Sequence, residues 1–240
     1  MTALLAAALP QAPASAPELR FHHLHIRDAP TAFWIEFYER LFDRAVTKRV
    51  TFRDAPALQT GSRLIVVSPT QPERQLPAAL WHFGWGKVSL GETYLAHARG
   101  EVAWEPPLPP EDLHVHLRSL APLQAAAWYR DVLGARVELA AVPSTPSAPL
   151  PAPEHRMPDA AIEVGGLRAL VYRTSGVLVS SIGQRIDHLA FSCDDLQSTL
   201  ASLQARGVAI LRGPDAEDGI RTAMIVGPDR IAIELVQLAQ

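Results

Sequence analysis

The sequence predicts an α+β fold built from tandem β-α-β-β-β units, and three observations lead to that prediction. A stretch with strand-like alternation of polar and apolar residues opens each unit, and a stretch with apolar residues at helical spacing follows it. Short strand-like runs separated by turn residues then close the unit. The pattern recurs along the chain, which is typical of an internal repeat.

The last unit, from Arg185 onward, shows this pattern most completely. It opens with RIDHLAFS, whose side chains alternate between two faces as in a strand. Asp194 or Asp195 can cap the helix that follows, and Gly207 is suited to end it. Two further strands are joined by Gly227-Pro228-Asp229, a tight-turn sequence.

The final strand of this unit carries a charge that apolar packing does not explain. Ile231, Ile233 and Leu235 alternate with more varied residues, among them Glu234. Because the apolar faces must cover the helix, we expect His188 and Glu234 to share the opposite face of the sheet. A buried carboxylate is costly unless it is paired or bound to a metal. This is the first indication of a site.

Four copies of the unit can be traced along the chain. They span about residues 20–68, 79–105, 112–174 and 185–238. In the second copy, Ser89 and Glu92 form a capping box that predicts a helix. That copy stops early at Pro106–Pro110, which is expected to be a stiff connector. In the third copy, the proline-rich insertion from Pro143 to Pro158 is expected to form an extended or mobile loop.

These boundaries predict two domains, one at residues 20–110 with a truncated second unit and one at residues 111–240. Residues 1–19 are rich in alanine and proline and contain Ala14-Ser15-Ala16, which is like a cleavage site. Two interpretations stay open for this segment: a disordered tail, or a degraded secretory signal. The protein is accordingly expected in a bacterial cytoplasm or exported to the periplasm.

Composition excludes several classes of partner. The net charge is −3 without a long basic run, which argues against nucleic acid and anionic membranes. No stretch approaches the roughly 20 apolar residues of a membrane span. The single cysteine, Cys193, excludes an intramolecular disulfide and a cysteine-rich metal cluster. We expect a small-molecule substrate as the partner, and a monomer or homodimer.

Each opening strand carries a histidine: His23, His82, His114 and His188. One buried histidine is usually a core residue, but four at equivalent positions, with Glu234 on the same face, favour a metal site in the second half of the chain.

In the third copy, alternation places His114, His116 and Arg118 on one face of the strand. Arg118 could pair with a substrate carboxylate or phosphate. An ordinary surface salt bridge is the alternative for this residue.

The repeated units resemble the vicinal oxygen chelate superfamily, in particular its two-domain bacterial members. The resemblance is carried by the strand histidines, by the FY or WY pair in the helix that follows, and by the closing GPDxxxIEL. It covers about residues 20–238. The superfamily includes glyoxalase I, extradiol dioxygenases and bleomycin-resistance proteins. The resemblance implies that pairs of units curl into curved-sheet cups with a divalent metal on the concave face.

Carried over to this chain, the resemblance implies His114, His188 and Glu234 as the metal ligands. His116 is the rival of His114, since it lies one pleat away on the same face. Two histidines and one carboxylate leave open positions for substrate and water. One Fe²⁺, Mn²⁺, Zn²⁺ or Ni²⁺ ion is therefore expected, with Glu234 and Arg118 as the catalytic candidates.

The first half is expected to hold only a degenerate site. It offers His23 and His82, but its truncated second unit has no counterpart of Glu234. The resemblance thus implies a metal-dependent lyase, isomerase or oxygenase acting on a small oxygen-rich substrate. The alternative is a non-catalytic ligand- or drug-binding protein of the bleomycin-resistance type. Extradiol dioxygenases also need a histidine and a tyrosine before the glutamate, and none follows His188.

Overall fold

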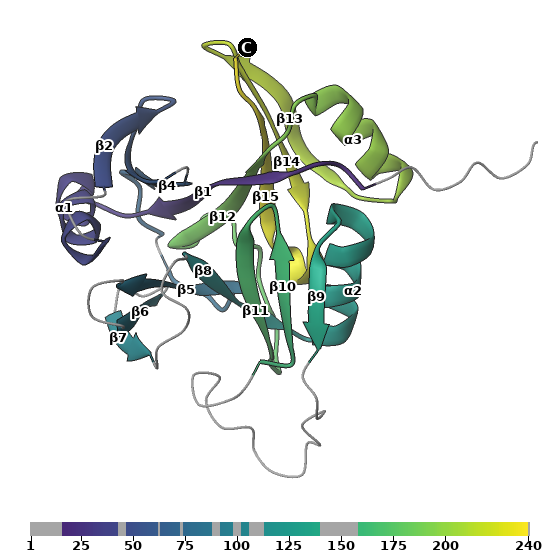
Figure 1. Cartoon of the computed structure of the whole chain (residues 1–240), viewed down its shortest axis with the longest axis horizontal. Helices are drawn as coiled ribbons and strands as arrows, with labels where there is room; N and C mark the ends of the chain where they lie inside the picture. The colour runs from purple at the N-terminus through teal and green to yellow at the C-terminus, as the bar shows by residue number, and fades with distance from the viewer. Residues whose placement is uncertain are drawn as a thin grey trace, which may run out of the picture.

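The computed structural model describes residues 16–42, 47–61, 63–72, 74–87, 92–97, 102–105, 113–139 and 158–239. Its strands form two curved sheets, and its helices pack against them (Figure 1). This arrangement confirms the α+β class and the order of strand, helix and three strands in the first, third and fourth units.

The first and fourth units together build an eight-stranded sheet. The first unit comprises β1 (Arg20–Arg27), α1 (Thr31–Phe42), β2 (Thr47–Phe52), β3 (Ala55–Thr60) and β4 (Arg63–Ser68). The fourth comprises β12 (Ile186–Ser192), α3 (Leu196–Ala205), β13 (Ile210–Glu217), β14 (Ile220–Val226), the 3-10 helix η2 (Pro228–Arg230) and β15 (Ala232–Gln237). The strands β1 and β12 run antiparallel at the centre, and β2 and β13 form the two edges.

The second and third units build a seven-stranded sheet. The second unit comprises β5 (Leu80–Lys87), β6 (Glu92–His97) and β7 (Val102–Glu105). The third comprises β8 (His114–Ser119), α2 (Pro122–Leu133), β9 (Arg136–Leu139), β10 (Ala160–Val164) and β11 (Leu167–Arg173). Here too the opening strands of the two units, β5 and β8, pair antiparallel.

The expected pairing of the first unit with the second, and of the third with the fourth, is wrong. The two middle units pair instead, and the two outer units pair with each other. All four opening strands carry one apolar and one histidine-bearing face, so the local pattern does not select a partner. The connector Pro106–Pro110 lies outside the described residues, and the predicted domain boundary at residue 110 stays a prediction.

The helix predicted in the second unit is also wrong. Residues 92–97 form strand β6, which pairs antiparallel with β5 and places Tyr94 opposite Trp85. The β-branched and aromatic residues Thr93 and Tyr94 favour an extended backbone, and pairing with β5 satisfies that preference.

Local signals for α3 are confirmed. The side chain of Asp195 accepts hydrogen bonds from the backbone amides of Gln197 and Ser198, so this residue is the N-cap. Gly207 has a φ of +79°, the left-handed conformation that glycine adopts without steric cost. The helix therefore begins and ends where its sequence predicts.

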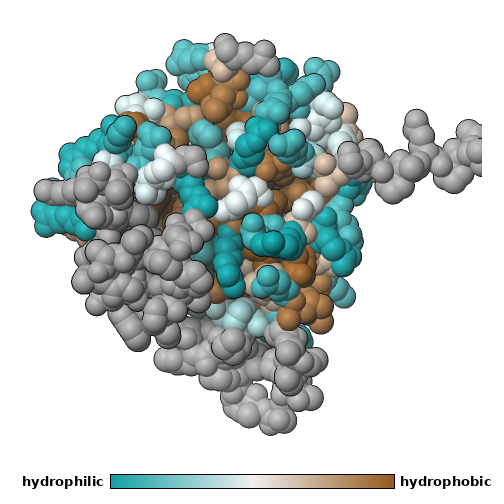
Figure 2. Space-filling view, in the orientation of Figure 1, coloured by the Kyte–Doolittle hydropathy of each residue, from teal (hydrophilic) through white to brown (hydrophobic). Residues whose placement is uncertain are grey.

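The core lies against the apolar faces of both sheets and joins them. Leu24, Phe83, Val115 and Leu189 are fully or almost fully buried in a single hydrophobic cluster. On the face shown in Figure 2, hydrophilic and hydrophobic residues are interspersed over the described part of the surface. Most of the predicted tail and of the proline-rich insertion lies outside the described residues.

Candidate metal centre

The candidate site lies on the face of the eight-stranded sheet that points away from the core, where β1 and β12 run side by side. Alternation along β1 buries Leu24 and Ile26 in the core, so His23 and His25 point to the opposite face. His25 pairs directly with His188 across the two strands. The first and last units therefore bring their histidines together.

Glu234 joins these histidines through the register of the neighbouring strand. Ala190 on β12 pairs with His23 on one side and with Glu234 of β15 on the other. Because alanine is small, the two larger side chains can meet above it. His23 is 0% exposed and Glu234 is 4% exposed, so the contact is shielded from solvent.

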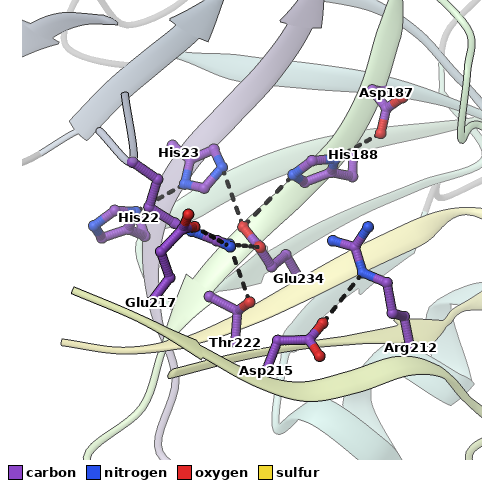
Figure 3. Close-up of polar contacts among 10 residues, drawn as sticks. His22, His23, Asp187, His188, Arg212, Asp215, Glu217, Thr222 and Glu234 are labelled. Atoms are coloured by element: carbon purple, nitrogen blue, oxygen red, sulfur yellow. Dashed lines mark hydrogen bonds and ion pairs between the residues drawn. The ribbon is translucent and has the colours of Figure 1, made fainter. Parts of the chain in front are cut away.

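One carboxylate oxygen of Glu234 faces two imidazole nitrogens (Figure 3). Glu234 Oε2 lies 3.4 Å from His23 Nε2 and 3.6 Å from His188 Nε2. Both nitrogens are buried, and neither has a hydrogen-bond partner in the described part of the chain. Buried polar atoms without a hydrogen bond are rare and call for an explanation.

The two distances from Glu234 Oε2 are compatible with a divalent ion shared by these residues. Ligand atoms about 2.1 Å from one ion lie roughly 3.0–3.4 Å apart in octahedral or tetrahedral geometry. The two separations from Glu234 Oε2 are close to that range. An ion at this place would also give each orphaned nitrogen a partner. His23, His188 and Glu234 thus form a two-histidine, one-carboxylate donor set.

His25 completes the cluster. One ligand atom each from His23, His25 and His188 lies within 4.8 Å of the others. The ring of His25 stacks on that of His188, with centroids 4.5 Å apart, and its Nε2 lies 3.0 Å from Ser68 Oγ. His25 therefore borders the donor set, and Ser68 orients its ring.

The first and fourth units are related by a local symmetry that matches their histidines but provides no second carboxylate. Leu24 of β1 pairs with Leu189 of β12, so these two leucines are equivalent. The residues directly before them, His23 and His188, are therefore equivalent too. The counterpart of Glu234 is then Val66, which pairs with His25 on β4. The site accordingly contains one glutamate rather than two.

Further polar groups orient the two histidines. Asp187 Oδ1 lies 2.6 Å from His188 Nδ1, and Asp187 Oδ2 accepts a hydrogen bond from the backbone amide of Gly183 at 2.7 Å. His22 Nδ1 lies 2.8 Å from His23 Nδ1. Both histidines thus turn Nδ1 toward a neighbour and Nε2 toward Glu234. A histidine held by a carboxylate, as His188 is by Asp187, is typical of metal ligands.

Electrostatics set His188 apart from His23 and His25. Burial alone would lower the pKa of His188, but Asp187 and Glu234 outweigh it and raise that pKa to about 9. Burial and the nearby His188 lower the pKa of His23 well below its ordinary value and that of His25 to about 3. For Glu234, burial raises the pKa, but His188 outweighs burial and the net shift is downward. A metal ion would therefore replace a proton on His188 Nε2.

Several predicted site residues lie in the other sheet. His114, His116 and Arg118 are on β8, where His116 pairs with His82 of β5. The structure thus does not bring His114, or its rival His116, to His188 and Glu234. The predicted combination of His23 with His82 is likewise divided between two sheets. The cause is the pairing of the outer units, which replaces His114 with His23 beside His188.

Arg118 does not face the metal centre. Its guanidinium lies over the ring of Trp81, 4.0 Å from the ring centroid, which is a cation–π contact within the seven-stranded sheet. In that sheet the ring of Tyr172 also stacks on His116, with centroids 5.1 Å apart. The group of histidines within mutual reach in the described part of the chain, His23, His25 and His188, lies in the eight-stranded sheet instead.

Sequence reasoning missed two contributors to the site. Asp187 directly precedes His188, and a carboxylate beside a ligand histidine is a signal that could have identified it. Arg53 lies in the turn between β2 and β3 and reaches Glu234, with 3.5 Å between NH1 and Oε1. A lone arginine in a polar turn carries no such signal.

Comparisons with known proteins agree with this architecture. Glyoxalase I from Zea mays has a similar structure, with a TM-score of 0.60 at 14% sequence identity over 92% of each chain. A variant of the same maize protein matches with a TM-score of 0.60 at 16% identity, also over 92% of each chain. An antibiotic binding protein from Streptomyces sp. CB03234 aligns with 52% of this chain and 93% of its own, at 20% identity and a TM-score of 0.37. A search of curated proteins finds no match.

Within the described part of the chain, none of the helices has the length and apolar character needed to cross a membrane. The sequence model of the Glyoxalase/Bleomycin resistance protein/Dioxygenase superfamily matches residues 113–235, which is half of the chain. The match includes His188 and Glu234 and most of the third and fourth units. The chain belongs to the Glyoxalase/Bleomycin resistance protein/Dioxygenase superfamily.

Proposed function

We propose that this chain is a metal-dependent enzyme that holds one divalent ion with His23, His188 and Glu234. The observation that carries the proposal is the pair of buried Nε2 atoms that face one carboxylate oxygen at ion-pair distance but make no hydrogen bond. The donor set of nitrogen and oxygen suits Fe²⁺, Mn²⁺, Zn²⁺ or Ni²⁺. When bound, the ion would act as a Lewis acid that stabilises negative charge on a substrate oxygen.

The remaining residues of the site would position the substrate. Two histidines and one carboxylate leave coordination positions for a small molecule with adjacent oxygen atoms. His25 stays neutral at physiological pH because its pKa is lowered to about 3. Its imidazole can therefore hold a substrate hydroxyl by a hydrogen bond without adding positive charge beside the ion.

A basic pocket next to the site supports an anionic substrate. The pocket has a volume of about 570 Å³, and its lining includes Arg27, Arg74, Gln71 and Gly183. Arg27 lies two residues beyond His25 on β1, and its NH1 is 3.5 Å from Asp187 Oδ2. Guanidinium groups bind carboxylate and phosphate oxygens well. We therefore assign the substrate to the class of small oxygen-rich anions, and the reaction to the lyase or isomerase type.

A second candidate function is binding without catalysis. It is favoured by Val66, which occupies the position in the first unit that is equivalent to Glu234. The site therefore lacks a second carboxylate at this position that could act as a base. A protein with this site could hold a metal-chelating ligand without converting it. Turnover of small 2-oxo or 2-hydroxy acids by the metal-loaded protein, measured against binding of the same compounds, would separate the two functions.

The metal proposal is tested by the metal content of protein purified without an affinity tag. We expect about one equivalent per chain in the wild type, and loss of that metal in His23→Ala and His188→Ala. His114→Ala is the matched control, because it removes a buried histidine at the equivalent place of the other sheet. Unchanged metal in His188→Ala, or loss in His114→Ala only, would show that the ligands are wrongly assigned.

A further inference from the structure

Arg53 joins the two edges of the eight-stranded sheet directly above the candidate metal centre. It lies in the turn between β2 and β3 at one edge, whereas Glu217 ends β13 at the other. Its Nε and NH2 donate to Glu217 Oε2 at 2.9 and 2.8 Å. Figure 3 shows the side chains of Glu217, Thr222 and Glu234 converging on one place. Arg53 thus spans the concave side of the sheet.

The inner end of Arg53 contacts Glu234. Its NH1 donates to Thr222 Oγ1 at 3.1 Å and lies 3.5 Å from Glu234 Oε1. Glu234 Oε2 is the other oxygen of the same carboxylate, and it faces His23 and His188. The two oxygens of one carboxylate therefore have different partners.

The turn itself supports a specific role. Arg53 and Asp54 have φ values of +45° and +61°, so both adopt the left-handed conformation of a two-residue hairpin turn. Asparagine and glycine are preferred in such turns, and an arginine there needs compensating contacts. The preceding residue, Phe52, packs its ring 5.1 Å from that of His23, measured between centroids. Phe52 at the end of β2 and Arg53 in the turn thus contact two of the three proposed ligands.

We propose that Arg53 is a positioning residue of the metal centre, which holds Glu234 Oε1 so that only Oε2 is presented to the ion. The inference rests on the proposed function, since it concerns the same site. A carboxylate that binds through one oxygen occupies one coordination position, whereas bidentate binding occupies two. Arg53 thereby keeps a position open for a substrate oxygen.

The test is titration of the metal-free protein with Co²⁺ alone, because its visible absorption reports coordination number and its affinity can be measured by competition with a chelator. We expect Arg53→Ala to weaken Co²⁺ binding about 10- to 100-fold, the usual effect of losing a group that orients a ligand. The absorption should also weaken, as an added carboxylate oxygen raises the coordination number. Arg53→Lys should restore part of the affinity.

Arg49→Ala is the matched control. Arg49 is in the same hairpin and pairs with Glu39, with 2.6 Å between NH2 and Oε2, on the outside of the molecule. It should leave Co²⁺ affinity and spectrum unchanged. Glu217→Gln keeps Arg53 but loosens its anchor, so it should weaken Co²⁺ binding by a few fold. This variant and Arg53→Lys carry the test if Arg53→Ala fails to fold.

Two failures can be told apart. If Arg53→Ala and Glu217→Gln lower the melting temperature but leave Co²⁺ affinity and spectrum as in the wild type, Arg53 only ties the edges of the sheet, and the positioning role is wrong. If the wild type does not bind Co²⁺, or His188→Ala binds it equally well, the proposed metal site fails, and the role of Arg53 fails with it.

Discussion

The two sheets of this molecule carry similar histidines but differ at the position that holds Glu234 in the eight-stranded sheet. In the fourth unit, Ala190, two places after His188, pairs with Glu234. In the third unit, the equivalent residue is His116, two places after His114, and it pairs with the buried Leu170. Histidines at equivalent places thus have a carboxylate beside them in the eight-stranded sheet and an apolar side chain in the seven-stranded sheet. The proposed metal site depends on this carboxylate on the last strand.

The largest expected effect comes from replacing Glu234 of the eight-stranded sheet with leucine, the residue type at the equivalent position of the seven-stranded sheet. Glu234→Leu should weaken divalent metal binding at least about a hundredfold, because it removes a charged ligand and leaves two neutral ones. Chelator competition on the purified variant measures the loss. Leu170→Val, the matched change in the other sheet, should leave metal affinity unaltered. Equal affinity in wild type and Glu234→Leu would remove Glu234 from the site.

The next largest effect is the pH dependence of the free energy of unfolding, to which the histidines of the two sheets should contribute differently. In the metal-free protein, the pKa of His188 is raised to about 9 from the ordinary 6.5, so the folded protein binds one more proton than the unfolded chain between these values. Its stabilisation is complete below pH 6.5 and is lost as the pH rises through 9, by on the order of 3 kcal/mol in total.

The pKa values of His23 and His25 are lowered, so their stabilisation is present above pH 6.5 and is lost as the pH falls. The free energy of unfolding should therefore peak near pH 6.5 when metal is chelated. Urea denaturation across pH 5–9 measures it. His188→Gln should abolish the alkaline decline, and His114→Gln should retain it. A flat profile between pH 7 and 9 in the wild type would contradict the assignment.

A smaller effect is expected from the residue that orients His188. Asp187→Asn should weaken metal binding about 10-fold, and at most 100-fold, since the amide keeps the shape but removes the charge on His188 Nδ1. Asp159→Asn is the control, because Asp159 is a carboxylate of the other sheet that pairs with Arg173. If the two variants bind metal alike, Asp187 does not orient a ligand.

The smallest effect concerns the helices on the two sheets. Asp195 caps α3 with two hydrogen bonds, whereas Ala121 at the N-cap of α2 makes no side-chain bond. Asp195→Ala should lower the free energy of unfolding by about 1 kcal/mol, and Ala121→Ser should raise it by a few tenths to about 1 kcal/mol. Thermal unfolding of both variants measures the difference. A stabilising Asp195→Ala would show that the cap is not needed.

Sequence patterns predicted local structure well and long-range pairing poorly. Glu234 and His188 stand out because each is polar within an apolar strand, and the structure places them together as expected. The helix cap and the turn glycine of the fourth unit also follow from local rules. The resemblance implies His114 rather than His23 as the partner of His188, with the third and fourth units forming one domain. Which opening strands pair depends on the packing of whole units, and no local pattern encodes it.

The second unit also shows that strand pairing can override a local sequence signal, here between two strands that are close in the chain. A capping box predicted a helix where β6 forms, because pairing with β5 outweighed the propensity of a few residues. Arg53 was missed for a related reason. Its role depends on two sheet edges that approach each other only after the sheet has curved, and a turn residue carries no periodicity that would reveal this.

The pairing of the outer units has a consequence for the synthesis of the protein. His23 emerges from the ribosome early, but its partners His188 and Glu234 follow only when translation is almost complete. Contacts of such sequence separation form late and slowly. A chain that stops before β15 would therefore leave β12 and β14 without the strand that lies between them, and would lack the only carboxylate proposed to bind the ion. If the proposed ligands hold the ion, only the finished polypeptide can acquire it, and metal-loaded truncation products should not accumulate in the cell.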